Sequence, residues 1–146
     1  MLKKIMTAVL CTAMVFSFAA CGEMTETAAE SERAFTLDGS YFDSASSQAM
    51  LEMEPLEDGK YLATVMWGAS SEEYYEWIMT VTPSEDGSRL EYTDCRRLFV
   101  VPNDATGHIE VETIYENGSG YFSVGNWTVY WDGAEEESCR ACVFEK

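Results

Sequence analysis

The sequence predicts an all-β protein: an antiparallel meander of about eight strands that closes into a small barrel. Apolar and polar residues alternate with period two through most of residues 39–146, which is typical of strands with one buried face. The links between these runs are short and contain turn pairs such as Asp58-Gly59, Asp86-Gly87 and Asn117-Gly118. Short links favour antiparallel neighbours, and closure removes exposed sheet edges. A sandwich of two sheets is the alternative.

The expected strands follow one another along the chain with few interruptions. Between the runs at 61–67 and 74–82, Ser70 and Glu73 match a capping box, which would begin a helix. Because residues 80–82 continue as strand, we prefer a long hairpin with a one-turn connector. The predicted strands cover residues 49–54, 61–67, 74–82, 90–93, 98–101, 109–116, 122–124, 127–131 and 140–145.

The first residues are organised like a secretory leader. Lys3 and Lys4 form a positive start, and residues 5–20 are uncharged and mostly apolar. The segment ends in Ala20-Cys21, and a cysteine directly after small residues resembles the lipobox of bacterial lipoproteins. This resemblance implies a diacylglycerol thioether on Cys21, with acyl chains such as palmitate, that anchors the protein on the outer face of the cell membrane. An ordinary secreted protein with a free thiol at Cys21 is the alternative.

These features divide the chain into a signal peptide at 1–20, a lipidated cysteine with an acidic spacer at 21–38, and a β-barrel domain at 39–146. Loss of the two leader lysines lowers the formal net charge from −17 to −19. Such a charge argues against nucleic acid and anionic lipid as partners. It suits a basic protein partner, although solubility alone would also explain it.

Two sets of residues in the body resemble known groups of proteins. The first set is Tyr61, Ala63, Val65, Trp67, Ser70, Glu73, Trp77, Tyr115-Glu116-Asn117-Gly118, Gly120, Phe122, Trp131 and Gly133. It looks like a group of small secreted proteins of anaerobic Gram-positive bacteria, which implies a β-rich fold and no particular function. The second set is Ser119-Gly120, Tyr130-Trp131 and Gly133-Ala134-Glu135. It is similar to the membrane-bound inhibitors of C-type lysozyme, which implies a small lipocalin-like or lysozyme-inhibitor-like barrel.

The residues expected to bind a partner fall into two groups. In the lysozyme inhibitors a Ser-Gly loop enters the lysozyme cleft, so Ser119 and Gly120 are the candidate binding loop, projecting between two strands. The second group consists of aromatic side chains at odd strand positions, which form either the core or a pocket for a small ligand. Its members are Tyr61, Trp67, Trp77, Trp127 and Trp131.

No residue pattern points to catalysis, a metal ion or a cofactor. His108 is the single histidine, without a recognisable nucleophile motif around it. The acids at 132–137 resemble a solvated charge run more than a calcium site. Cys139 and Cys142 lack a second cysteine pair, so a disulfide from Cys95 to one of them is the favoured expectation outside the cytoplasm.

The sequence therefore favours a non-enzymatic envelope lipoprotein whose barrel is a binding or interaction module for an unknown ligand. Inhibition of a basic, lysozyme-like wall hydrolase is one alternative. Carriage of a small ligand inside the barrel is the other.

Overall fold

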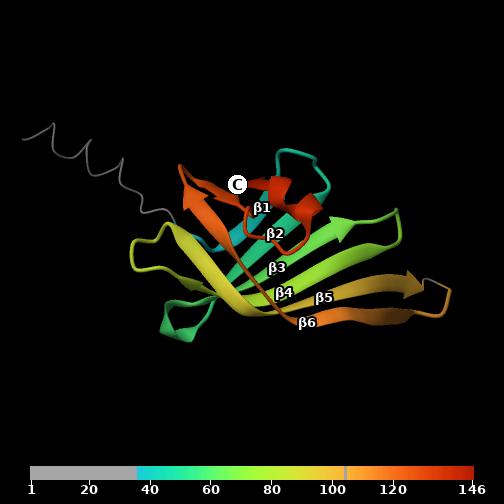
Figure 1. Ribbon diagram of the computed structural model, residues 1–146. Helices are drawn as coiled ribbons and strands as arrows, with labels where there is room; N and C mark the ends of the chain where they lie inside the picture. The colour runs from blue at the N-terminus through green and yellow to red at the C-terminus, as the bar shows by residue number, and fades with distance from the viewer. Residues whose placement is uncertain (1–35, 104) are drawn as a thin grey trace, which may run out of the picture. The chain divides into compact units, whose positions relative to one another are not determined.

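The computed structural model describes residues 36–103 and 105–146, and in this part of the chain eight antiparallel strands form one closed ring (Figure 1). Each strand pairs with its neighbour in sequence, and β1 also pairs with β8 through Phe42–Glu145 and Asp43–Phe144, which closes the barrel. The all-β meander predicted from period-two patterning is confirmed. The strands are β1 (Gly39–Asp43), β2 (Ala49–Pro55), β3 (Tyr61–Gly68), β4 (Tyr74–Pro83), β5 (Arg89–Asn103), β6 (His108–Gly125), β7 (Thr128–Tyr130) and β8 (Val143–Glu145).

The predicted leader at 1–20, Cys21 and most of the spacer at 21–38 lie outside the described residues. Among the residues that are described, no helix is long and apolar enough to cross a membrane. Helical structure there is limited to two 3-10 turns, η1 (Glu57–Gly59) and η2 (Glu137–Ala141).

The strand boundaries differ from the prediction in four places, one of which is the last predicted strand at 140–145: Arg140 and Ala141 lie in η2, and β8 begins only at Val143. The runs at 90–93 and 98–101 are parts of one strand, β5, and those at 109–116 and 122–124 are parts of β6. The prediction of a turn at Asn117-Gly118 is therefore wrong. Asn117 has a φ of +61° inside a bulge of β6, and Gly118 pairs with Cys95 of β5. A bulge tolerates the turn-forming residues without reversing the chain. The first strand, β1, was not predicted.

The connectors between β3 and β4 and between β4 and β5 behave as predicted. Ser70 and Glu73 form a hairpin turn and not a helix start, since the Ser70 hydroxyl accepts the Glu73 backbone N–H at 3.1 Å while the chain reverses. Gly87 has a φ of +69°, which glycine adopts without strain, and it turns the chain from β4 into β5.

Side chains at alternating strand positions fill the ring. In β2, β3 and β4 the odd-numbered residues point inward, and the register aligns Leu51 with Val65 and Val65 with Trp77 on this face. Among the described residues, twelve large side chains are essentially inaccessible to solvent, so the interior is a packed core. They are Tyr41, Leu51, Met53, Val65, Trp77, Met79, Val81, Leu90, Phe122, Val129, Trp131 and Phe144.

Residues 131–142, here called the closing segment, connect the short strands β7 and β8 and complete this core. Trp131 lies 5.4 Å from Phe122 and 5.5 Å from Trp77 between ring centroids. Its indole N–H donates to the Tyr92 hydroxyl at 3.0 Å. Because β7 and β8 have three residues each, the closing segment supplies the buried surface that longer strands would otherwise provide.

Candidate interaction surface

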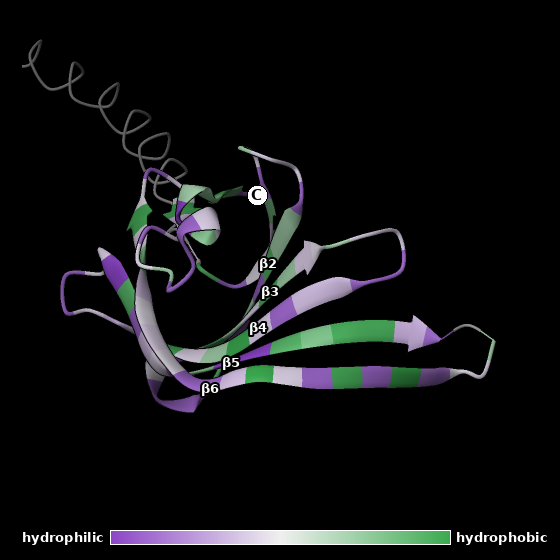
Figure 2. Cartoon of the chain, turned by 45° about the vertical axis from the view of Figure 1, so that its right-hand side comes forward, coloured by the Kyte–Doolittle hydropathy of each residue, from purple (hydrophilic) through white to green (hydrophobic). Residues whose placement is uncertain are grey.

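The β5–β6 hairpin extends beyond the closed part of the barrel (Figures 1 and 2). The first residue of β4, Tyr74, pairs with Val100, so the end of β5 continues past β4. On the other side, β7 pairs only with residues 123–125 of β6. Residues 108–113 of β6 are therefore hydrogen-bonded as a strand to β5 alone within the described chain. Their side facing away from β5 is called the free edge.

Two rows of side chains run along this part of β6. The inner row, which continues the interior face of the barrel, contains His108, Glu110 and Glu112, and the outer row contains Ile109, Val111 and Thr113. Figure 2 shows the resulting change between hydrophilic and hydrophobic residues along β6, next to a continuously hydrophobic stretch of β5. A bulge at Ile114 ends both rows, since Thr113 pairs with Leu98 but Tyr115 with Arg97.

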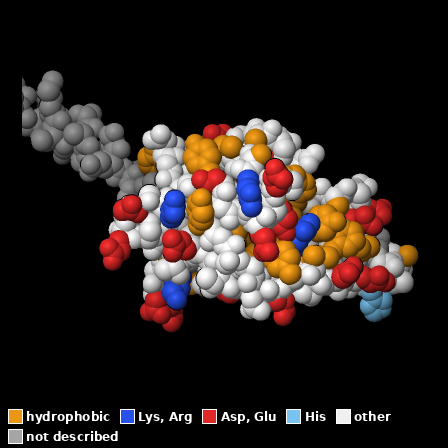
Figure 3. Space-filling model, viewed as in Figure 1, with side chains coloured by type: hydrophobic (Ala, Val, Ile, Leu, Met, Phe, Trp, Pro, Cys, Tyr) orange, Lys and Arg blue, Asp and Glu red, His pale blue; other side chains and the backbone are white. Residues whose placement is uncertain are grey.

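Exposed aliphatic side chains are concentrated here. Ile109, Val111 and Ile114 are 65%, 55% and 43% exposed, all within six residues of chain. In the rest of the described chain, the large exposed apolar side chains are distributed over other elements: Phe42, Leu56, Trp127 and Tyr130. Figure 3 shows the face of the hairpin end that carries the histidine, and on this face acidic side chains lie next to hydrophobic ones. Single exposed apolar residues are ordinary, but a cluster marks a surface that contacts something else.

The base of the hairpin is fixed to the closing segment by an ion pair. Arg97 of β5 contacts Glu136 at 3.0 Å, with the two side chains 22% and 18% exposed. The Arg97 guanidinium also lies 4.5 Å from the centre of the Tyr75 ring and 5.0 Å from that of Trp77. Such stacking is favourable for a planar cation. The hairpin therefore leaves the barrel in a defined direction.

The hydroxyl of Tyr115 strengthens this junction from β6. It donates to Glu136 at 3.3 Å. Burial, together with the nearby thiol of Cys95 and the Glu136 carboxylate, raises the pKa of Tyr115 well above its ordinary value of 10.0. The phenol therefore stays protonated and remains a hydrogen-bond donor across the physiological pH range.

The five aromatic candidates do not form one pocket. Trp77 and Trp131 are 2% and 1% exposed and pack edge to face in the core. Tyr61 and Trp67 are partly buried, and the Trp67 indole N–H donates to Gln48 at 3.1 Å. Trp127 is 59% exposed, since it precedes β7 in a turn where its φ is +68°. All five residues have odd numbers, but only Trp77 and Trp131 pack against each other. Strand ends and turns break the alternation of faces that would have aligned the others.

Ser119 and Gly120 do not form a projecting loop, so that prediction is wrong. Both lie inside β6, where Gly120 pairs with Tyr92 of β5. A Cβ atom on Gly120 would collide with the Gly133 carbonyl oxygen and the Tyr92 hydroxyl. The closing segment crosses β6 at Gly120, and a side chain at this position would hold the closing segment away from the strand.

The expected disulfide from Cys95 to the C-terminal pair is not formed. Cys95, Cys139 and Cys142 are all free and buried. Cys95 packs beside Gly118, and Cys139 and Cys142 lie in and directly after η2. Burial raises the pKa of the Cys95 thiol to about 12, that of Cys139 to about 11 and that of Cys142 to about 12. They behave as small apolar core groups.

The remaining candidates have structural surroundings. His108 is exposed at the start of β6. In the acidic run, Asp132 accepts a hydrogen bond from Ser123 at 2.8 Å and Glu136 pairs with Arg97. Over residues 36–103 and 105–146, no group of His, Cys, Asp and Glu side chains is arranged to hold a metal ion.

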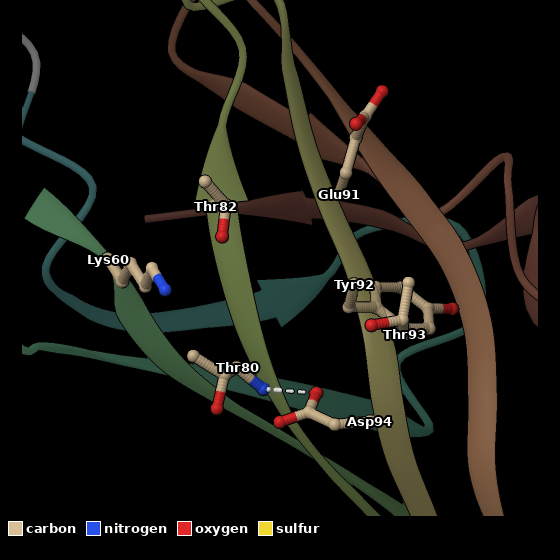
Figure 4. A pocket seen from close by; sticks show the side chains of 7 residues that line it. All are labelled: Lys60, Thr80, Thr82, Glu91, Tyr92, Thr93 and Asp94. Carbon is tan, nitrogen blue, oxygen red and sulfur yellow. Dashed lines mark hydrogen bonds between the residues drawn. The ribbon is translucent and has the colours of Figure 1, made fainter.

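A polar hollow of about 460 Å³ lies where β4 and β5 separate. The register shifts between Ile78 and Thr82, and the Asp94 carboxylate accepts the Thr80 backbone N–H at 2.9 Å in place of a β5 carbonyl. Figure 4 shows Asp94 turned toward Thr80 and the Lys60 side chain extended toward β4. Sequence patterning could not reveal this site, because it arises from a bulge that interrupts pairing.

Two surfaces thus have the geometry to receive a partner: the apolar and acidic hairpin, and the polar hollow between β4 and β5. The hairpin offers aliphatic side chains and a free strand edge, whereas the hollow offers charges and hydroxyl groups. No protein-family model, curated protein or solved structure matches this chain.

Proposed function

We propose that this protein is a cell-envelope lipoprotein, anchored through lipid on Cys21, whose barrel is a non-enzymatic interaction module. In this arrangement the barrel lies outside the cell membrane, and the β5–β6 hairpin binds a partner protein. The observation that carries it is the exposure of Ile109, Val111 and Ile114 beside a strand edge that no described segment covers.

Exposure of these side chains has a physical cost that binding would recover. Burial of an aliphatic side chain is worth about 1.5–3 kcal/mol, so three exposed ones represent a substantial unused driving force. The junction of Arg97 with Glu136 holds the hairpin in one direction before binding. A pre-organised surface loses less conformational entropy when its partner docks.

The two alternative functions, inhibition of a wall hydrolase and carriage of a small ligand, are supported to different degrees by the structure. Inhibition of a basic wall hydrolase still fits the net charge of −17, but the inserting element would have to be the β5–β6 hairpin, because Ser119-Gly120 lies within a strand. Carriage of a small ligand inside the barrel is disfavoured by the packing of Trp77 against Trp131. A small polar ligand would instead fit the hollow that Lys60 and Asp94 line.

Photo-crosslinking in producing cells tests the interaction module. A benzoylphenylalanine at position 111 of the full chain is expected to form covalent adducts with a partner protein. The same group at position 42 is the matched control, since Phe42 of β1 is 62% exposed but lies on the barrel wall. Equal adduct formation from both positions, or none from position 111, would contradict the assignment to the hairpin.

Metabolic labelling with a fatty acid tests the anchor separately. The wild-type chain is expected to incorporate label and to partition into detergent, and Cys21→Ala is expected to do neither. Cys95→Ala is the control, because it removes a buried cysteine and leaves the leader intact. Unlabelled wild-type protein would contradict the lipid anchor without affecting the crosslinking result.

A further inference from the structure

The free edge of β6 offers main-chain hydrogen-bonding groups as well as side chains. Successive residues of a strand direct their N–H and C=O groups to opposite sides, so those not bonded to β5 face the open side. Figures 1 and 2 both show no other described segment beside this part of β6. An edge of this kind is a template for an additional strand.

The length of the edge is limited at both ends. It begins at His108, directly after the hairpin turn, and the bulge at Ile114 interrupts it after Thr113. Six residues of regular strand therefore remain, which corresponds to about 20 Å. A segment of this length is enough for specific strand addition, and the bulge sets its register.

The two rows on β6 define what the added strand must carry. A residue directly opposite on a neighbouring strand shares the same face of the sheet. Residues opposite Glu110 and Glu112 would meet carboxylates, which favours Lys or Arg. Residues opposite Ile109 and Val111 would meet exposed aliphatic groups, which favours Val, Ile or Thr.

We infer that the free edge of β6, from His108 to Thr113, binds an extended segment of a partner protein in which basic and β-branched residues alternate. This inference rests on the proposed function and specifies the chemistry of its partner. Charge complementarity selects this occupant, since the whole chain carries 26 acidic against 9 basic residues and the edge itself carries two glutamates.

The same charges disfavour the two other occupants. If two copies paired antiparallel through this edge, a centre at Val111 would place Glu110 opposite Glu112, and a centre at Glu110 would place that residue opposite its own copy. Like charges directly opposite each other destabilise a sheet. The chain's own segment at 22–37 has the wrong composition for this edge, since its sequence carries acids at 23, 26, 30 and 32 against one basic residue, Arg33.

A binding experiment with designed peptides tests the inference directly. The probe is a fluorescein-labelled ten-residue peptide of alternating Lys and Val, titrated with the purified full-length chain and followed by fluorescence anisotropy. Two peptides of the same charge are the controls: one with its lysines and valines in separate blocks, and one N-methylated at every valine. The alternating peptide is expected to bind at least about tenfold more tightly than either control, because only it can form a strand with matched rows.

A charge-reversed variant separates local from general electrostatics. Glu110→Lys with Glu112→Lys is expected to weaken binding of the Lys–Val peptide about tenfold and to create binding of an alternating Glu–Val peptide. Glu54→Lys with Glu85→Lys changes the net charge equally at exposed sites on other elements and is expected to change affinity less than about twofold. Circular dichroism of both variants verifies that the barrel is retained.

Hydrogen exchange gives a second readout that does not depend on the variants. Binding of the Lys–Val peptide is expected to slow exchange of backbone amides within residues 108–113 and to leave those of β3 unchanged. Equal affinity for the block peptide, or protection confined to other strands, would overturn the inference. Crosslinking from position 111 in cells together with such a result would reject strand addition and leave the proposed function standing.

Discussion

The carboxylate of Asp43, at the end of β1, accepts a hydrogen bond from the backbone N–H of Val143, at the start of β8, over 3.0 Å. The same carboxylate accepts the backbone N–H groups of Ala45 and Ser46, each at 3.1 Å, and the Ser46 hydroxyl. One side chain, 2% exposed, thus shapes the turn after β1 and holds the last strand against the first. It sits where the barrel closes.

Replacing this carboxylate is expected to weaken the barrel at its closure. Asp43→Asn leaves one acceptor oxygen for four donors, so we expect the free energy of unfolding to fall by about 2–4 kcal/mol. Denaturant titration at pH 7 measures this loss. Asp38→Asn, at an exposed site before β1, is the control and is expected to change stability by less than about 0.5 kcal/mol.

The same residue predicts a dependence on acid pH. Burial raises the pKa of Asp43, but the hydrogen bonds from Ser46, Val143 and Ala45 outweigh it and hold the pKa below the usual 3.8. The carboxylate therefore stabilises the folded state above about pH 4 and loses this effect as pH falls through the lowered pKa. The stability difference between wild type and Asp43→Asn should shrink as pH falls below 4; a difference that stays constant would contradict the assignment.

The glycine where the closing segment crosses β6 is expected to be intolerant of any side chain. In Gly120→Ala, the added methyl group would collide with the Gly133 carbonyl and the Tyr92 hydroxyl, and we expect a loss of about 1–3 kcal/mol. Gly125→Ala on the same strand is the control, because nothing lies within 4 Å of its Cβ position. Equal losses at the two sites would show that strand propensity, and not the crossing, determines the effect.

Two tryptophans with similar sequence patterns should differ in their energetic contribution. Trp77→Ala leaves a large cavity beside Trp131, and we expect it to cost about 3–5 kcal/mol. Trp67 is only partly buried, so Trp67→Ala should cost about half as much. Thermal and denaturant unfolding of both variants measure the difference. A larger loss from Trp67→Ala than from Trp77→Ala would contradict the assignment of the core.

The three buried thiols should be inaccessible to alkylating reagents, and they should lower the stability of the barrel at alkaline pH. At pH 8, iodoacetamide is expected to leave Cys95, Cys139 and Cys142 unmodified in the folded protein and to modify them in denaturant, as mass spectrometry of peptides can show. Their raised pKa values, about 11 to 12 against the usual 9.0, mean that burial stabilises the protonated form. Stability should therefore be retained below about pH 9 and decline as pH rises from 9 toward 12. Rapid modification of the folded protein would show that these cysteines are accessible.

Local patterning was sufficient to predict which residues share one face of the central strands. Leu51, Val65 and Trp77 occupy alternate positions of their runs, and the period-two geometry of a strand sends such side chains to one face whatever the rest of the chain does. The hairpin connector at Ser70 was predictable for the same reason, since the strand patterns on both sides continue up to it.

The functional surface was not predictable in this way. Asn117-Gly118 carries the local signal of a turn, yet β6 continues through it as a bulge, because pairing with β5 on both sides outweighs the local preference. If the chain turned at Asn117-Gly118, residues 108–116 would be expected to form a separate strand in the wall of the barrel. Their exposure and the free edge appear only when the lengths of β5 and β6 are compared with those of their neighbours.

By itself, the sequence determined the fold class, the two alternating faces of β2, β3 and β4, and a strong negative charge, because each depends on composition or on spacing along one strand. Tertiary structure alone decided the closure of β1 on β8 through Asp43 and Val143, which lie 100 residues apart, and the crossing at Gly120. It also decided where the ring stops and the hairpin continues. Such features depend on the pairing of distant segments, and the energy of that pairing is not encoded in any short stretch of residues.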